Sequence, residues 1–283
     1  MGLFDWLHRK GRTGESREPM RQTPDPPPAR RVAARALVLA ALHYRLIFEV
    51  FLLQRADGES RVGNANLLSW VQEAGLLPEF EPEERALLEA PLGRLPPDAT
   101  GNESWRLEGL GVLAWALHRY RLPPYDAVVG SAVLEGLELF TRDGSADLRD
   151  TAVLRPPEEV RRYATQITIV SWRLRQFGLP RGSQLYQEVT RSAPPWGHGV
   201  AERMDFVALL RAHPGFEEWW LDGLRLAGGD LALGGRALAD ASPEDVQQCT
   251  AIAVARQVAA YWLRGDEPIY SRVRPNTVLL GCS

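Results

Sequence analysis

The fold is decided by the stretch ARRVAARALVLAALHYRLIFEVFLLQR, residues 29–55. Its apolar side chains occupy almost every side of a helix with about 3.6 residues per turn, which is typical of a helix at the centre of a domain. His43, Arg45 and Glu49 interrupt the stretch too often for a helix that spans a membrane. Arg45 and Glu49 are spaced i,i+4 and can form an ion pair, which makes their burial tolerable. We therefore expect residues 29–55 to form a central helix.

Most other segments also carry helical patterns with start and stop signals. One helix is expected to begin at Asn64 or Asn66 and to end near Gly75, and another to begin with Asp126 as its N-cap. Further helices are expected in the segments EPEERALLEA, ESWRLEGLGVLAWALHRY, PPEEVRRYATQITIVSWRLRQFG and AERMDFVALLRAH. The predicted fold class is mainly α, with a single multi-helix domain of about eight to ten helices.

The part of the chain from Leu224 onward combines a strand signal with a long helix. Short apolar runs on either side of Gly228-Gly229-Asp230 predict a minor β-hairpin near residues 224–238. Ser242 and Asp245 form a capping box, and Gly265 follows as the expected end of the final helix.

Composition and periodicity divide the chain into four regions. Residues 1–10 form an amphipathic segment, residues 11–30 a linker rich in proline and arginine, residues 31–265 the helical domain, and residues 266–283 an irregular tail. The apolar side of the first region consists of Leu3, Phe4, Trp6 and Leu7. So short a segment is unstable as an isolated helix, so we expect these side chains to contact the protein's own domain, a protein partner or a membrane surface.

Length, charge and cysteine content limit the class of protein. The chain has 283 residues, of which 45% are hydrophobic, and this is enough for a substantial core. A formal net charge of −3 and an isoelectric point near 6.0 argue against a nucleic-acid-binding protein, which typically has an isoelectric point above about 9. Two cysteines and the lack of a signal-peptide pattern lead us to expect a cytoplasmic protein.

No motif specifies a reaction. A P-loop needs a glycine-lysine pair after a strand, whereas the single lysine is Lys10. The histidines and cysteines stand too far apart for a zinc site, so we expect no metal ion and no cofactor. Gly109 and Gly111 match a degenerate dinucleotide fingerprint, but they lie inside a helical stretch with no strand before it. They are expected to let a neighbouring helix approach closely.

The segment ESWRLEGLGVLAWALHRY brings charged residues and tryptophans together in one mostly buried helix. A buried Arg106 or Glu108 must be paired, because an uncompensated charge in a core costs several kcal/mol. One interpretation is therefore a structural ion-pair network, with Arg45, Glu49 or Arg173 as partners.

The other interpretation is a pocket for an anionic or polar ligand. The Arg106 guanidinium would act there as a planar fork, and Trp105 or Trp115 as a wall. The loop PPWGHG, residues 194–199, adds an aromatic ring and a titratable group. The ligand-pocket candidates are Trp105, Arg106, Glu108, Trp115, Trp196 and His198.

The order of several segments resembles a known bacterial family. RALVLAALHYRLIFE, LLSWVQEAGLLPEFEPEERALL, SWRLEGLGVLAWAL and the late GGDLALGGRALADASPEDV and AVARQVAAYWLRG are together similar to the family called domain of unknown function 4272. The likeness spans about Arg30 to Gly265. The late helix of that family usually carries Glu-Arg-His and then Ala-Leu-Asn-Trp-Leu, whereas residues 254–263 here lack the Glu, His and Asn. The resemblance implies a helical domain and no established activity.

These observations favour a non-enzymatic, cytoplasmic module that binds a protein partner, since the nine tryptophans offer anchors for an interface. An enzyme or small-ligand binder, with its pocket around residues 105–108, is the alternative. A weaker alternative is a membrane-surface adaptor that acts through residues 3–10.

Overall fold

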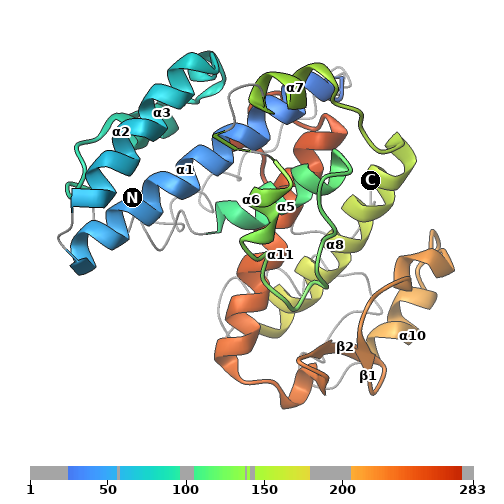
Figure 1. Cartoon of the computed structure of the whole chain (residues 1–283). Helices are drawn as coiled ribbons and strands as arrows, with labels where there is room; N and C mark the ends of the chain where they lie inside the picture. Colours follow the sequence, from blue (N-terminus) through green and yellow to red (C-terminus); the bar gives the residue numbers. More distant parts are fainter. Residues whose placement is uncertain are drawn as a thin grey trace, which may run out of the picture.

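A computed structural model of the protein describes residues 25–55, 58–95, 105–137, 139–140, 144–178 and 205–275. These residues form a mainly helical fold with nine α-helices and a small three-stranded antiparallel sheet (Figure 1). The predicted fold class is confirmed. The predicted contact residues Leu3, Phe4, Trp6 and Leu7 and the loop residues Trp196 and His198 lie outside the described residues.

The first helix, α1 (Ala29–Arg55), forms the centre of one half of the molecule. The helices α2 (Gly58–Glu73) and α3 (Pro82–Glu89) pack along one side of α1, and α5 (Arg106–Ala116) packs along another. The short helix α7 (Gly144–Asp150) lies near the start of α1 (Figure 1). Because α1 is in contact on several sides, its apolar residues extend round the helix, as the sequence pattern predicts.

By length and composition alone, α1 could cross a membrane, but more than half of that stretch is buried within the protein. Its two interrupting charges are buried as well, and they pair with each other: Arg45 Nη1 lies 2.8 Å from Glu49 Oε2. The predicted ion pair is therefore confirmed. Glu49 also accepts hydrogen bonds from the backbone amides of Gly93 (2.9 Å) and Leu95 (3.2 Å), which attaches the chain after α3 to α1.

The second half of the molecule is built on α8 (Pro157–Gly178) and α11 (Pro243–Arg264), which pack along each other. Helix α5 also packs against α11, and so connects the two halves (Figure 1). A methyl group added to Gly109 would collide with the hydroxyl group of Tyr270 and would lie 3.8 Å from Ala259 of α11. The prediction that the glycines of α5 permit close approach of another helix is therefore confirmed for Gly109.

The end of α11 forms as the sequence predicts, and at its start one of the two hydrogen bonds of the predicted capping box forms. Ser242 Oγ accepts a hydrogen bond from the amide of Asp245 (3.1 Å), and Gly265 ends the helix with φ 87°. Helix α2 ends before Gly75 as predicted, but it begins at Gly58 rather than at Asn64 or Asn66. The added turns are stabilised by packing against α1, which the local sequence does not show.

The helix predicted to begin at Asp126 is absent, and only the short α6 (Ala132–Glu135) forms in that segment. Asp126 accepts hydrogen bonds from Arg225 (3.1 Å) and from the amide of Gly234 (3.1 Å) instead of capping a helix. Long-range hydrogen bonds therefore replace the local ones that a helix would provide. This prediction was wrong because the partners lie about a hundred residues away in the sequence.

The sheet follows α10 (Phe206–Arg211) and comprises β1 (Leu226–Ala227), β2 (Asp230–Leu233) and β3 (Arg236–Ala237) in the order β1-β2-β3. The predicted hairpin is the β1-β2 pair, with Leu226 opposite Leu231, and a second tight turn adds β3. The sheet is followed by the 3-10 turn Leu238–Asp240, and the described residues also form the 3-10 turns Leu77–Glu79, Glu218–Leu221 and Tyr270–Arg272. Within the predicted tail, Tyr270 and Val273 are buried.

We predict that Gly109→Ala lowers the free energy of unfolding by about 1–3 kcal/mol, because the new methyl group has no space beside Tyr270. Gly58→Ala is the control, since Gly58 also lies in a helix but has no atom within 4 Å of the added carbon. Urea denaturation of both variants measures the difference. Equal stability of the two variants would contradict the close packing of α5.

We also predict that Glu49 stabilises the fold in a pH-dependent way. Burial alone would raise the pKa of Glu49, but hydrogen bonds from Gly93, Arg45 and Leu95 lower it below its usual value. The carboxylate therefore stabilises the fold above the pKa of the unfolded chain, and this stabilisation is lost as the pH falls through the lower folded value. The stability difference between wild type and Glu49→Gln should shrink from pH 7 to pH 3. The exposed Glu89, changed to Gln, should show no comparable trend.

Candidate binding groove

The charges at the start of α5 form ion pairs within the core. The side chain of Arg106 pairs with Glu84 of α3, which Arg35 of α1 also contacts. Glu108 is buried and pairs with Arg256 of α11 at 2.8 Å, and its other oxygen accepts a hydrogen bond from the amide of Val129 (2.8 Å). The predicted structural ion-pair interpretation therefore holds for both residues.

The partners proposed from the sequence, however, were wrong. Arg45 and Glu49 pair with each other, and Arg173 donates to Asp230 of β2 at 2.9 Å. The choice of partner depends on which helices meet, and the sequence alone does not show this.

Arg256 uses its whole guanidinium group within the protein. Its Nε donates to Glu108 Oε2 (2.9 Å), and Nη1 donates to the carbonyl oxygens of Pro123 and Pro124, both at 3.1 Å. Nη2 donates to the carbonyl of Ala127 (2.7 Å) and lies 2.8 Å from Glu108. The guanidinium group thus holds the non-helical segment after α5 against α11, because each nitrogen has at least one acceptor.

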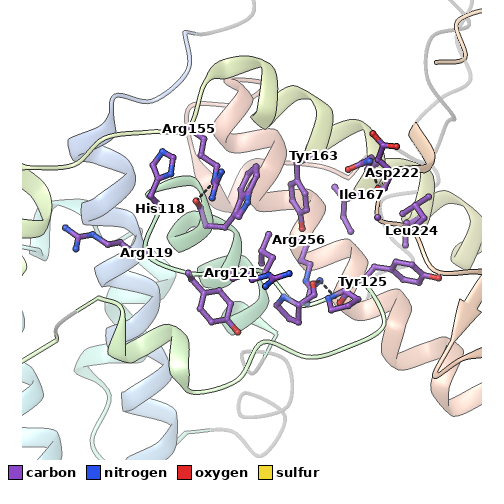
Figure 2. Close-up of a pocket in the computed structure, with 18 residues that line it drawn as sticks. His118, Arg119, Arg121, Tyr125, Arg155, Tyr163, Ile167, Asp222, Leu224 and Arg256 are labelled. Carbon is purple, nitrogen blue, oxygen red and sulfur yellow. Dashed lines mark hydrogen bonds between the residues drawn. The ribbon is translucent and has the colours of Figure 1, made fainter. Parts of the chain in front are cut away.

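This segment forms one wall of a groove of about 1060 Å³, which is open to solvent (Figure 2). The second wall is the face of α8 with Tyr163, Ile167 and Val170, and the turn before β1 closes one end with Asp222 and Leu224. Arg256 lies at the base of the groove between these walls. In Figure 2, His118, Arg119 and Arg155 lie toward one end and Asp222 and Leu224 toward the other.

The first end of the groove is cationic. His118, Arg119 and Arg121 are exposed, and their side chains make no hydrogen bond or ion pair with another described residue. Arg155 is already engaged: its Nε donates to the carbonyl of Trp115 (2.9 Å), its Nη1 pairs with Glu159 (2.9 Å), and its guanidinium carbon lies 4.9 Å from the centre of the Trp115 ring. His118, Arg119 and Arg121 can therefore contact an anion in the groove, whereas the charge of Arg155 is partly compensated by Glu159.

Aromatic rings line the groove beside these cations. The ring centres of Trp115 and Tyr163 are 4.9 Å apart. Burial raises the pKa of Tyr163 to about 12, and the hydroxyl group is therefore neutral at physiological pH. Burial also raises the pKa of Tyr125, whose hydroxyl group contacts the carbonyls of Arg225 and Ala232 at 2.7 Å. Tyr163 thus provides an apolar wall, and Tyr125 provides structural hydrogen bonds.

The groove and the predicted pocket overlap only in part. Trp115 lines the groove, and Glu108 contributes indirectly by fixing Arg256. Trp105 and Arg106 are half-buried at the other end of α5 and do not line it. Among the described residues, no group of three His, Cys, Asp or Glu side chains is arranged to hold a metal ion.

Sequence reasoning did not single out His118, Arg119, Arg121, Arg155 and Tyr163 as pocket residues. The first three lie in the run HRYR, residues 118–121, directly after the predicted helix. Glycine is typical at that position, so a run of basic residues there is a signal that the sequence does contain. Arg155 and Tyr163 have no local signal, because α8 brings them to the groove from a distant part of the sequence.

Comparison with known families gives one match. The family model described as Domain of unknown function (DUF4272) matches residues 17–192, which is more than half of the chain. The match includes α1 to α8 and ends before the sheet and α11. The segments GGDLALGGRALADASPEDV and AVARQVAAYWLRG, which also resemble the family, therefore lie beyond the matched residues. No curated protein and no solved structure matched the chain.

We predict that Arg256→Ala lowers the free energy of unfolding by about 3–5 kcal/mol, because it leaves the buried Glu108 carboxylate without its partner. Arg236→Ala is the matched control. Arg236 also pairs with a carboxylate, Asp245, at 3.0 Å, but its side chain is 60% exposed, and its removal should change stability by about 0.5 kcal/mol or less. Urea denaturation measures both. Similar losses in the two variants would argue against the buried pair as the support of the groove.

Proposed function

Because the chain belongs to the DUF4272 family, whose description names no activity, we propose a function from its groove: the protein is a binding module that takes up an acidic peptide segment of a protein partner.

The observation that carries this proposal is the concentration of unengaged cations beside aromatic rings. Each buried arginine in the described part of the chain is paired with a carboxylate, as Arg256 is with Glu108. At the end of the groove, by contrast, Arg119 and Arg121 are exposed and make no side-chain ion pair with a described residue. Guanidinium groups bind carboxylates in a planar, two-pronged geometry, so this end suits the side chain of an aspartate or glutamate.

The size and shape of the groove support a peptide over a small molecule. Pockets for small ligands typically enclose about 300–1,000 Å³ and bury most of the ligand. This groove has about 1060 Å³ and is open to solvent. An extended peptide would place an acidic side chain near Arg121 and apolar side chains against Trp115 and Tyr163.

The overall charge of the protein does not favour the binding of an acidic segment. With a formal net charge of −3, the molecule as a whole does not attract anions. Attraction of an acidic segment therefore depends on the few cations at the groove, and it should weaken as salt concentration rises.

We predict that a fluorescently labelled peptide of alternating Glu and Leu binds the protein, and that the corresponding peptide of Lys and Leu does not. Arg121→Glu should raise the dissociation constant of the acidic peptide about tenfold, which corresponds to roughly 1.4 kcal/mol. Fluorescence anisotropy at low salt measures these constants.

The matched control is Arg61→Glu, since Arg61 is an exposed arginine on α2 that does not line the groove. Equal weakening by the two charge reversals would indicate only a long-range charge effect and would overturn the proposal. Binding of neither peptide, together with a metabolite retained on purification, would favour the small-ligand alternative.

A further inference from the structure

Three helices of this protein, α2, α5 and α11, end in the same pattern of backbone hydrogen bonds. A residue with positive φ donates its amide three residues back, and its successor donates five residues back. This pattern is the Schellman motif, in which glycine is the usual residue at the left-handed position. In α2 that residue is Gly75 (φ 62°), and in α11 it is Gly265 (φ 87°).

In α5 the same position is occupied by His118, with φ 61°. Its amide donates to the carbonyl of Trp115 (3.0 Å), and the amide of Arg119 donates to Ala114 (2.9 Å), so the motif is complete. Histidine is among the residues found in this region more often than most, but its Cβ makes the left-handed conformation less favourable than it is for glycine. Two of these helix ends thus have glycine at the left-handed position. The end of α5, which faces the groove, has His118 there, in a strained backbone conformation.

The imidazole of His118 is placed where a ligand would contact it. The side chain is exposed, lines the groove and makes no hydrogen bond with a described residue that would offset the strain. Arg155 Nε donates to the same carbonyl, that of Trp115, as the amide of His118 does. His118 and Arg155 therefore flank one carbonyl oxygen at the cationic end of the groove (Figure 2).

We propose that His118 is a contact residue for an anionic side chain of the bound peptide, and that it occupies the glycine position because its imidazole takes part in binding. Strained backbone positions concentrate at functional sites, where the surrounding structure holds them. The exposed imidazole adds a hydrogen-bond donor to this end of the groove, where Arg155 is already paired with Glu159. This inference rests on the proposed function of the groove.

The test compares His118→Gly with His118→Ala. Both variants remove the imidazole, but only glycine relieves the left-handed strain. We expect both to raise the dissociation constant of the Glu-Leu peptide about tenfold by fluorescence anisotropy. Only His118→Gly should raise the melting temperature, by about 2–4 °C. A gain in stability combined with a loss of binding is the result that a purely structural histidine would not produce.

The outcomes separate this inference from the proposed function. If wild-type protein binds the peptide and both variants bind it equally well, His118 is not a contact residue, although the groove remains the binding site. If wild-type protein does not bind the acidic peptide, the proposed function fails and the inference fails with it. If His118→Ala binds as wild type while only His118→Gly loses affinity, rigidity of the helix end, and not the imidazole, is what binding requires, and the inference is overturned.

Discussion

The groove depends on one buried ion pair, between Glu108 of α5 and Arg256 of α11. The two residues are 148 positions apart in the sequence, and both are almost completely buried. A buried carboxylate or guanidinium is tolerated only when its charge and hydrogen-bonding groups are satisfied, so each residue requires the other. The remaining donors of Arg256 hold the carbonyls of Pro123, Pro124 and Ala127. A single contact thus joins two helices and shapes the wall of the groove.

Arginines serve two purposes in this protein, and their environment separates the two. Arg35, Arg45 and Arg173 are buried and paired with carboxylates; the pairs of Arg35 and Arg173 connect elements that are distant in the chain, whereas that of Arg45 lies within α1. The exposed Arg119 and Arg121 have no such partner among the described residues. Because the buried arginines are paired with carboxylates of the protein, their charges are not available to a ligand. The electrostatic character of the groove therefore comes from a small number of residues next to the end of α5.

The candidate site was only partly predictable. The sequence indicated that Glu108 would be paired and that Trp115 could form a wall, because charge and aromatic surface within a buried helix limit what those residues can do. It did not identify Arg256 as the partner, nor Tyr163 as the opposite wall. Both come from helices later in the chain, and no local pattern specifies which helix faces which. The left-handed conformation of His118 was likewise visible only in the folded backbone.

The sequence by itself determined the mainly helical class, the central α1 with its Arg45–Glu49 pair, the hairpin of β1 and β2, and both ends of α11. These features depend on residues within a few positions of one another, through side-chain periodicity, capping and turn chemistry. Only the tertiary structure decided that residues 121–130 are not helical, that α2 begins at Gly58, and that a groove opens between α8 and the segment after α5. Those outcomes follow from hydrogen bonds and packing between distant segments, which override local helix preference wherever they satisfy the backbone as well.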